Sequence, residues 1–360
     1  MPATATRPPA RSGGNVYKRR TVRPRWGRIA LVVGVVLTLI GLFAGGYGLY
    51  YVNSLDDKVK RDDPFAQITG DRPAKVVDGA LNILVLGSDS RDGAAFNPND
   101  PSSTTNTVAG ERADTIMLMH ITAKQDKAYL ISIPRDTYVF VPEYKGNGGY
   151  RAKINAAYAW GGSGLTAQTV ERFTGVKIDH VAKVDFNGFQ KMTDALGGVD
   201  VTVDKTVYDP RSKRTFQAGV NHLDGTMALD YVRQRYNLPR GDFDRVQRQQ
   251  IFMRALMQKA TDSGTLTNPA KLKSFLDATA GAVTVDKGFS LKDMALQFRK
   301  LRADDLAFVT TPNLGSSNVD GQSVVLSDKT KASALFEAVT NDKVAEWLVA
   351  NPANDVTKGR

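Results

Sequence analysis

Apolar positions along the chain form short runs separated by polar turns, after one long uncharged run near the N-terminus. Short apolar runs bounded by Gly, Pro, Asp or Asn are typical of strands, and apolar positions three or four apart are typical of helices. The pattern predicts strands at 81–91 (running into a Gly-Ser-Asp loop), 114–122, 128–139 (broken by Pro134), 178–186, 198–203, 304–312 and 323–327. It predicts helices at 153–160, 165–175, 187–197, 243–260 and 328–350.

A polar loop at 93–110 separates the first two predicted strands, and a tight connection at 123–127 joins the second to the third. Short connections favour antiparallel neighbours, so we expect these three strands to run up, down and up. The end of the first strand, the start of the second and the end of the third then meet at one sheet edge. The charged residues expected there are Asp89, Arg91, Arg112, Asp114, Arg135 and Asp136. Because strands and helices interleave, we expect an α/β fold, with a mixed central β-sheet flanked by helices on both faces, in one domain over 80–350.

The uncharged run covers residues 29–55, and about 20 apolar residues suffice to cross a bilayer as a helix. We therefore expect one transmembrane helix at 29–52. Residues 1–28 carry eight basic and no acidic residues, which predicts a disordered cytoplasmic tail and places the rest of the chain outside the cell. A polar linker at 53–79 and a C-terminal tail at 351–360 complete the expected organisation. A cleaved signal peptide is disfavoured, because the run is too long and no small-x-small cleavage site follows.

The formal net charge of +11 belongs mainly to this N-terminal tail, because the remaining chain has 40 basic and 37 acidic residues. A nearly neutral body outside the membrane disfavours a nucleic-acid partner. The chain has no cysteine, so disulfides and thiolate metal sites are excluded. The abundance of Arg, Ala and Gly suggests a high-GC Gram-positive source.

The stretch "YVRQRYNLPRGDFDRVQRQQ" at 231–250 is dense in arginine and contains no lysine. Arginine forks match phosphate oxygens in a bidentate way, whereas lysine is a point charge. Asp242 is expected to be the N-cap of the helix that follows, and Arg245 and Gln249 then share one helical face. Arg233 and Arg235 are expected to alternate on an extended segment and point the same way. The alternative is a solvated surface with ordinary ion pairs.

Two aspartates at the predicted sheet edge, Asp89 and Asp114, are candidate ligands for a hard cation such as Mg²⁺, which takes one or two carboxylates and completes its shell with phosphate and water. The other candidate sites are weaker. "GSGLTA" at 162–167 fits a dinucleotide-binding pattern but follows a predicted helix, not a strand. His120, His180 and His222 are far apart in sequence, and the first two are expected to be structural.

Eight segments occur in a fixed order: "NILVLGSDSR", "RADTIMLMHI", "LISIPRDTYV", "KINAAYAWGG", "HVAKVDFNGF", "LGGVDVTVD", "LDGTMALDYVRQRY" and "GDFDRVQRQQ". In this order they resemble the LytR-CpsA-Psr family of cell envelope proteins. The resemblance is dense over residues 81–260 and looser to about 345. It implies a membrane-anchored enzyme that transfers a glycopolymer (teichoic acid, arabinogalactan or capsular type) from a polyprenyl-pyrophosphate carrier to a peptidoglycan hydroxyl, by resemblance the C6 hydroxyl of muramic acid.

The resemblance also assigns roles to residues. It implies Mg²⁺, with Mn²⁺ as an alternative, on Asp89 and Asp114, and an essential acidic residue at Asp242. It implies pyrophosphate binding by Arg135, Lys153, Arg233, Arg235, Arg245 and Gln249, helped by Arg91 and Arg112. The arginines Arg135, Arg233, Arg235 and Arg245 are expected to act in catalysis together with Asp242.

One departure from the family is a longer loop between Asp89 and Asp114. Two other functions remain open on these residues. A polyprenyl-pyrophosphate hydrolase would use the same site with water as the acceptor, and a non-catalytic envelope protein would bind the carrier and regulate.

Overall fold

The structure is a computed structural model that describes residues 54–68, 70–88, 113–260, 264, 268–290, 293–294, 301 and 303–354. All of them lie in the second of two compact units into which the chain divides, residues 31–360. The expected transmembrane helix at 29–52 and the cytoplasmic tail lie outside the described residues. Within the described part, no helix has the length and apolar character needed to cross a bilayer.

The central sheet has seven strands and mixes parallel and antiparallel pairs. Its order is β1 (Lys60–Asp62), β12 (Val283–Asp286), β7 (His180–Asp185), β2 (Leu81–Ser88), β3 (Ala113–Ile121), β4 (Ala128–Ile133) and β13 (Leu306–Thr310). The first three predicted strands are antiparallel neighbours, as expected. The pairs β2–β7, β4–β13 and β1–β12 are parallel.

Side chains along β2 alternate between two hydrophobic clusters, because successive residues of a strand point to opposite faces. Ile83 belongs to one cluster, while Leu84 and Leu86 belong to the other, and all three are at most 3% exposed. The sheet is therefore buried on both faces, which explains why its central strands are nearly continuous apolar runs.

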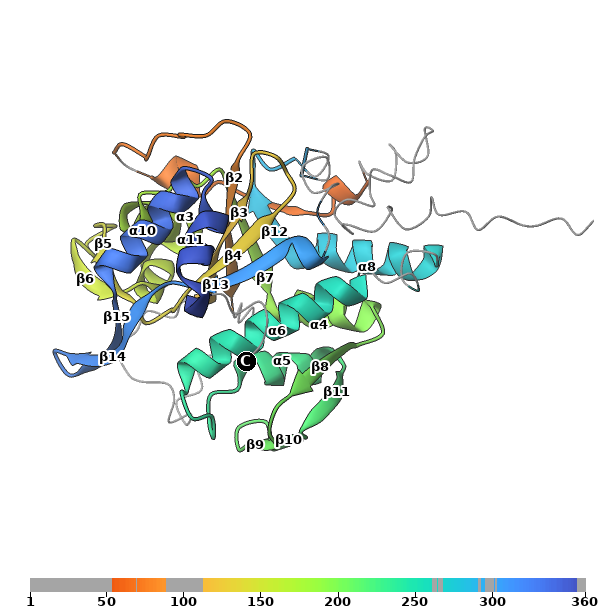
Figure 1. Cartoon of the computed structure of the whole chain (residues 1–360). Helices are drawn as coiled ribbons and strands as arrows, with labels where there is room; N and C mark the ends of the chain where they lie inside the picture. Colours follow the sequence, from red (N-terminus) through yellow and green to blue (C-terminus); the bar gives the residue numbers. More distant parts are fainter. Residues whose placement is uncertain are drawn as a thin grey trace, which may run out of the picture. The chain divides into compact units, whose positions relative to one another are not determined.

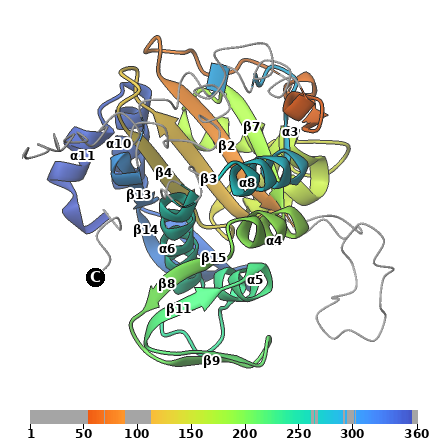
Figure 2. The same cartoon turned by 90° about the vertical axis from the view of Figure 1, so that its right-hand side faces the viewer.

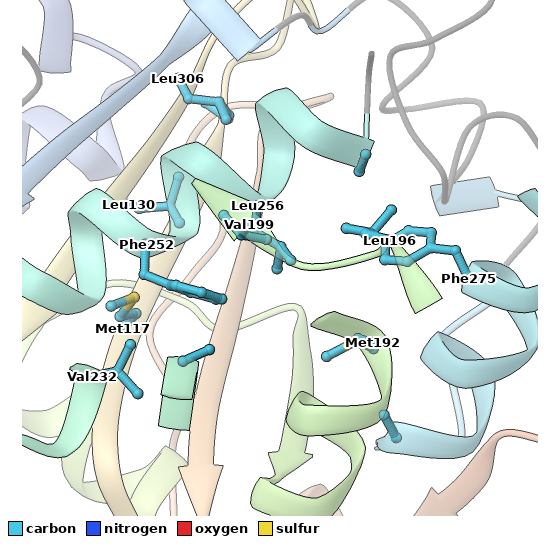
Figure 3. Packing of buried hydrophobic residues seen from close by; sticks show 14 of the residues in the cluster. Met117, Leu130, Met192, Leu196, Val199, Val232, Phe252, Leu256, Phe275 and Leu306 are labelled. Carbon is cyan, nitrogen blue, oxygen red and sulfur yellow. The ribbon is translucent and has the colours of Figure 1, made fainter. Parts of the chain in front are cut away.

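Helices cover both faces of the sheet, as predicted (Figures 1 and 2). One face packs against α3 (Asn155–Thr174), α10 (Lys329–Thr340) and α11 (Val344–Ala350). The other packs against α4 (Phe186–Ala195), α5 (Gly225–Arg233), α6 (Asp242–Ala260) and α8 (Pro269–Ala282). Figure 3 shows this second cluster, with Phe252 and Leu256 of α6 directed toward Met117 and Leu130 of the sheet.

Four two-stranded hairpins surround this core. They are β5 (Tyr138–Val141) with β6 (Tyr150–Lys153), β8 (Val199–Val203) with β11 (Gly219–Leu223), β9 (Val207–Asp209) with β10 (Arg214–Phe216), and β14 (Asn313–Val319) with β15 (Gln322–Ser327). Short 3-10 turns occur at Phe65–Gln67, Ala303–Asp305 and Pro352–Asn354.

Two expectations need correction, and a third is confirmed. The helix expected at 328–350 is two helices, because Asp342 between them adopts a φ of 56°. Its carboxylate accepts bonds from His120 and from the backbone N–H of Ala123, which hold the break against the sheet. The linker expected at 53–79 is not separate from the domain where it is described, because β1 pairs with β12 and Leu55 is fully buried. The two helices expected at 153–160 and 165–175 are confirmed: they are the two parts of α3, separated by a kink where Gly161 and Gly162 have non-helical backbone angles.

His120 and His180 both make structural contacts, as predicted. His120 is fully buried between the side chains of Asn82 and Asp342. His180 bonds Asp286, whose carboxylate also accepts from the backbone N–H groups of Val181 and Gly288. Asp286 thus ties β12 to β7. Burial alone would raise its pKa, but these hydrogen bonds outweigh burial and lower the pKa overall.

Replacing Asp286 with asparagine is expected to reduce the free energy of unfolding near neutral pH by about 2 kcal/mol, because hydrogen bonds to a buried charged acceptor are lost. Since the folded pKa lies below the unfolded value of 3.8, the carboxylate stabilises the fold above about pH 4 and ceases to do so as pH falls further. Urea unfolding should give a difference in the free energy of unfolding between wild type and variant that is constant from pH 7 to about pH 4. Below pH 4 this difference should become smaller.

A matched control for this change is Asp200→Asn. Asp200 also pairs with a histidine, His222, at 2.7 Å, but both side chains are more than half exposed. Its replacement should cost under about 0.5 kcal/mol at any pH, because exposed ion pairs contribute little. An equal loss in both variants would contradict the role given to burial at Asp286.

Candidate active site

A small hollow opens between one end of the central sheet and the helices α4, α5 and α6. The residues that line it are Thr115, Arg135, Phe186, Arg211, Val232, Arg233, Arg235, Arg245 and Gln249. Five of these are arginines, and none is acidic. Four of the five, all but Arg211, were predicted from the sequence to bind one anion.

Arg245 and Gln249 lie on one face of α6, as their spacing predicted. The side chain of Arg245 is only 3% exposed although it carries a charge. Gln249 donates from Nε2 to the carbonyl oxygen of Val232, at 3.3 Å, which connects α6 to the C-terminal end of α5. This contact fixes two sides of the hollow relative to each other.

Arg233 and Arg235 both reach the hollow, but not from an extended segment as expected. Arg233 is the last residue of α5, and Gln234 after it has extended backbone angles. The guanidinium of Arg233 lies over the ring of Phe186, 4.7 Å from its centroid. Gln234 separates the two arginines in the sequence, and it is buried, with 1% exposed. The sequence analysis did not predict this helix, which is only nine residues long.

Arg248 was not singled out by the sequence analysis, although it holds this segment in place. Its Nη1 donates to Oε1 of Gln234 at 2.7 Å, and its guanidinium lies over the rings of Tyr231 and Phe216, 4.5 and 5.4 Å from their centroids. Burial lowers its pKa, opposed by negative charge nearby. One signal could have found it: Arg248 precedes the core residue Phe252 by four positions, so it lies on the buried face of α6.

Arg135 follows β4, where the broken strand was expected to end. Asp136 lies between two cations, since Oδ2 is 3.7 Å from Nε of Arg135 and Oδ1 is 3.5 Å from Nζ of Lys153. Lys153 is not among the residues that line the hollow. Asp136 thus links Lys153 to Arg135. The direct role of Lys153 in anion binding stays a prediction.

The remaining predicted residues are only partly described. Asp89, Arg91 and Arg112 lie outside the described residues. Asp114 lies in β3, and Ser88, which precedes Asp89 in the sequence, pairs with Ala113, which precedes Asp114. Among described residues no group of three or more His, Asp or Glu is arranged to hold a metal. Two carboxylates at one end of β2 and β3 would still suit Mg²⁺, which needs no more than that from protein.

Asp242 is the first residue of α6 rather than the residue before it, a shift of one position from the expected N-cap. Gly241 precedes it with a φ of 52°, a backbone conformation that favours glycine. The "GD" pair therefore starts α6 and sets the position of Arg245 one turn later. The side chain of Asp242 lies outside what the structure describes.

The charge of the hollow decides what it can bind. Arginines that converge in a partly buried space, with no described carboxylate among the lining residues, create a strong positive potential. Planar guanidinium groups also match the oxygens of phosphate groups better than ammonium groups do. The geometry is that of a site for a multiply charged phosphate-type anion.

Comparison with known proteins agrees with the motifs in the sequence. A model of the LytR_cpsA_psr family matches residues 48–341. The chain belongs to this family. LcpA, a cell wall biosynthesis protein of Corynebacterium glutamicum, is 35% identical to this family member over 334 positions, a match that covers 85% of this chain and 64% of that protein. This family member therefore spans less than two thirds of LcpA.

Two further relatives carry more explicit names. The polyisoprenyl-teichoic acid–peptidoglycan teichoic acid transferase TagU of Oceanobacillus iheyensis is 34% identical over 273 positions, covering 72% of this chain and 77% of TagU. The structure of TagT from B. subtilis bound to LI-WTA superposes with a TM-score of 0.54 at 25% identity, covering 76% of this chain and 96% of TagT. The TagT structure shares the fold of this chain.

Proposed function

We propose that this protein is a membrane-anchored phosphotransferase of the cell envelope. It moves a glycopolymer from a polyprenyl-pyrophosphate carrier to a hydroxyl of peptidoglycan and forms a phosphodiester link. The observation that carries the proposal is the hollow lined by five arginines and no described carboxylate. Family membership and the teichoic acid transferase TagU among the relatives support it.

The arginines would act on the charge of the donor. A pyrophosphate diester resists attack because its oxygens repel a nucleophile, and positive groups fixed around it remove that barrier. Arg233 is held against the ring of Phe186. Arg235 follows Gln234, which is anchored by its bond to Arg248, and Arg245 is part of helix α6. The three arginines can therefore bind the pyrophosphate without reorganisation and stabilise the departing phosphate.

The proposed step forms one bond and breaks one. A peptidoglycan hydroxyl oxygen forms a bond to the phosphorus that carries the glycopolymer. The bond from that phosphorus to the bridging oxygen breaks, and polyprenyl monophosphate leaves with the electron pair. The hydroxyl proton passes to a carboxylate, for which Asp242 is the candidate at the start of α6.

Mg²⁺, with Mn²⁺ as an alternative, is proposed as the cofactor on Asp89 and Asp114. When bound, the ion would neutralise part of the pyrophosphate charge. The carboxylates of the protein would orient it, and Thr115, next to Asp114 in β3, lines the hollow. The polymer that is transferred, whether teichoic acid, arabinogalactan or capsule, is not specified by these residues.

The test uses the full chain in detergent, a short saccharide on polyprenyl pyrophosphate, Mg²⁺ and uncrosslinked peptidoglycan. Mass spectrometry of the glycan should reveal covalently attached saccharide phosphate, which removal of Mg²⁺ abolishes. Hydrolysed donor with no attached saccharide would indicate a pyrophosphatase instead. Intact donor that remains bound to the protein would indicate a binding protein.

Replacing Asp89 with asparagine is expected to weaken Mg²⁺ binding, because one of two charged ligands is lost. Calorimetric titration of Mg²⁺ into the protein with farnesyl pyrophosphate should give a dissociation constant raised at least about tenfold, or about 1.4 kcal/mol. Asp126→Asn is a control in the turn at the opposite ends of β3 and β4, where Asp126 bonds Thr122. Equal dissociation constants for Mg²⁺ in Asp89→Asn and wild type would contradict the assignment of Asp89 as a metal ligand.

A further inference from the structure

The hairpin formed by β5 and β6 extends from the candidate active site to an exposed surface. Its register pairs Tyr138 with Lys153 at one end and Val141 with Tyr150 at the other. Lys153 contacts Asp136 beside the hollow. Tyr150 is the first residue of β6 and precedes Lys153 by three positions. At about 3.3 Å per residue, the two residues are about 10 Å apart along the strand. The hairpin therefore connects the site to Tyr150 by a short path.

Two aromatic side chains, Tyr150 and Trp160, meet at the far end of this hairpin. The rings of Tyr150 and Trp160 contact each other, with centroids 5.7 Å apart and planes tilted by 60°. Tyr150 is 53% exposed, while Trp160 is partly buried against the core on the α3 face of the sheet. We call Tyr150 and Trp160 the aromatic pair.

The aromatic pair rests on rigid structure. Trp160 ends the first part of α3, directly before the kink at Gly161. The ring of Tyr144 packs so closely there that a Cβ at Gly161 would lie 3.0 Å from its Cδ1. The turn that precedes Tyr150 is held by reciprocal backbone bonds between Tyr144 and Asn147. A ligand would therefore meet a preformed surface, which lowers the entropy cost of binding.

An exposed tyrosine beside a partly exposed tryptophan offers an apolar face with polar edges. The rings of sugars have the complementary character, because one face of a pyranose presents C–H groups and its rim presents hydroxyls. The neighbouring cations Lys145 and Arg151 are both exposed on the same hairpin. This combination suits an anionic glycan chain better than an apolar protein partner.

We infer that the aromatic pair is a saccharide-binding subsite for the peptidoglycan acceptor strand, positioned about 10 Å along β6 from Lys153. The inference rests on the proposed function for the choice of glycan. The donor, under the proposed function, is held through its pyrophosphate. The acceptor presents only a hydroxyl to the reaction, so its affinity must come from sugar rings bound beyond the hollow.

The experiment compares the full chain in detergent with its Tyr150→Ala variant, using soluble uncrosslinked glycan strands as the probe. Calorimetry should give a dissociation constant for the strands raised about tenfold in the variant, or about 1.4 kcal/mol. In the transfer reaction, KM for the acceptor should rise while kcat and KM for the donor stay unchanged. Binding of farnesyl pyrophosphate, which has no sugar, should also be unchanged.

Two further variants make the test specific. Tyr208→Ala removes a tyrosine of similar exposure, 48%, from strand β9, and should leave strand binding intact. Glycan strands should change the tryptophan fluorescence of the wild type, and Trp160→Phe should remove that signal. The other two tryptophans, Trp26 and Trp347, remain in that variant as internal references.

The outcomes separate this inference from the proposed function. Strand binding that Tyr150→Ala weakens, in a protein without transferase activity, supports the subsite and contradicts the transferase. Unchanged strand binding in Tyr150→Ala, or no strand binding by the wild type, overturns the subsite whatever the transfer assay gives. A rise in KM for the donor alone overturns the assignment to the acceptor.

Discussion

Arg235→Ala is expected to reduce transfer by at least about 10²–10³-fold in kcat, the usual cost of losing one preorganised group that stabilises charge in the transition state. Arg235 lines the hollow but belongs to neither α5 nor α6, so its loss removes charge without breaking a helix. The variant should keep the unfolding transition of the wild type. Single-turnover transfer and urea unfolding, measured on the same preparation, check both statements.

Arg240→Ala is the matched control for Arg235→Ala. Arg240 lies five residues later on the same connection, and its side chain is 62% exposed, where it pairs with Asp244 at 2.7 Å. Its replacement should change kcat less than about twofold, because exposed pairs contribute little. Similar rates in Arg235→Ala and wild type would remove the arginine cluster from the mechanism.

Arg248→Met is expected to lower both activity and stability. The variant leaves Oε1 of Gln234 buried without its donor, which costs about 1–3 kcal/mol. It also removes the contacts of the guanidinium with Tyr231 and Phe216. Because Gln234 separates Arg233 from Arg235, the loss of its anchor should displace both arginines. We expect transfer to fall about 100-fold or more, in line with the cost of misplacing catalytic groups by about 1 Å.

A double variant distinguishes positioning from general stability. Replacing both Gln234 and Arg248 with methionine removes the unpaired buried group, so unfolding stability should recover most of the loss. Transfer should stay low, since nothing then fixes the segment between the two site arginines. Arg248→Lys, which keeps a charged donor, should restore part of the activity. If transfer returned together with stability in the double methionine variant, Arg248 would have no positioning role.

The central sheet could be predicted because its strands are buried on both faces. Runs such as 81–88 and 128–133 carry little besides apolar residues, and that pattern has few other solutions in a domain of this size. The short turn between β3 and β4 then determined their antiparallel pairing. The helix α6 could also be predicted, because its charged and apolar positions repeat with a helical period.

The peripheral elements were harder to predict from the sequence, because tertiary contacts rather than local sequence patterns determine them. Strand β1 is three polar residues, and only its pairing with β12 makes it a strand. The helix α5 contains one arginine that the sequence placed on an extended segment. At the site, charge density and spacing indicated the arginines. The function of Arg248 could not be read from its charge, because it depends on Gln234 lying opposite, fourteen positions earlier in the sequence.

The order of strands in the central sheet also constrains when the fold can be completed. The inner strands β7, β2, β3 and β4 come from residues 81–185, but the strands that cover their two outer sides, β12 and β13, begin only at Val283 and Leu306. A nascent chain would therefore present two open sheet edges until β12 emerges, and one until its last 55 residues, from Leu306 on, emerge. Open edges template aggregation. Truncations that end between residues 250 and 305 should therefore be lost to aggregation or proteolysis even though they retain every residue proposed for the active site.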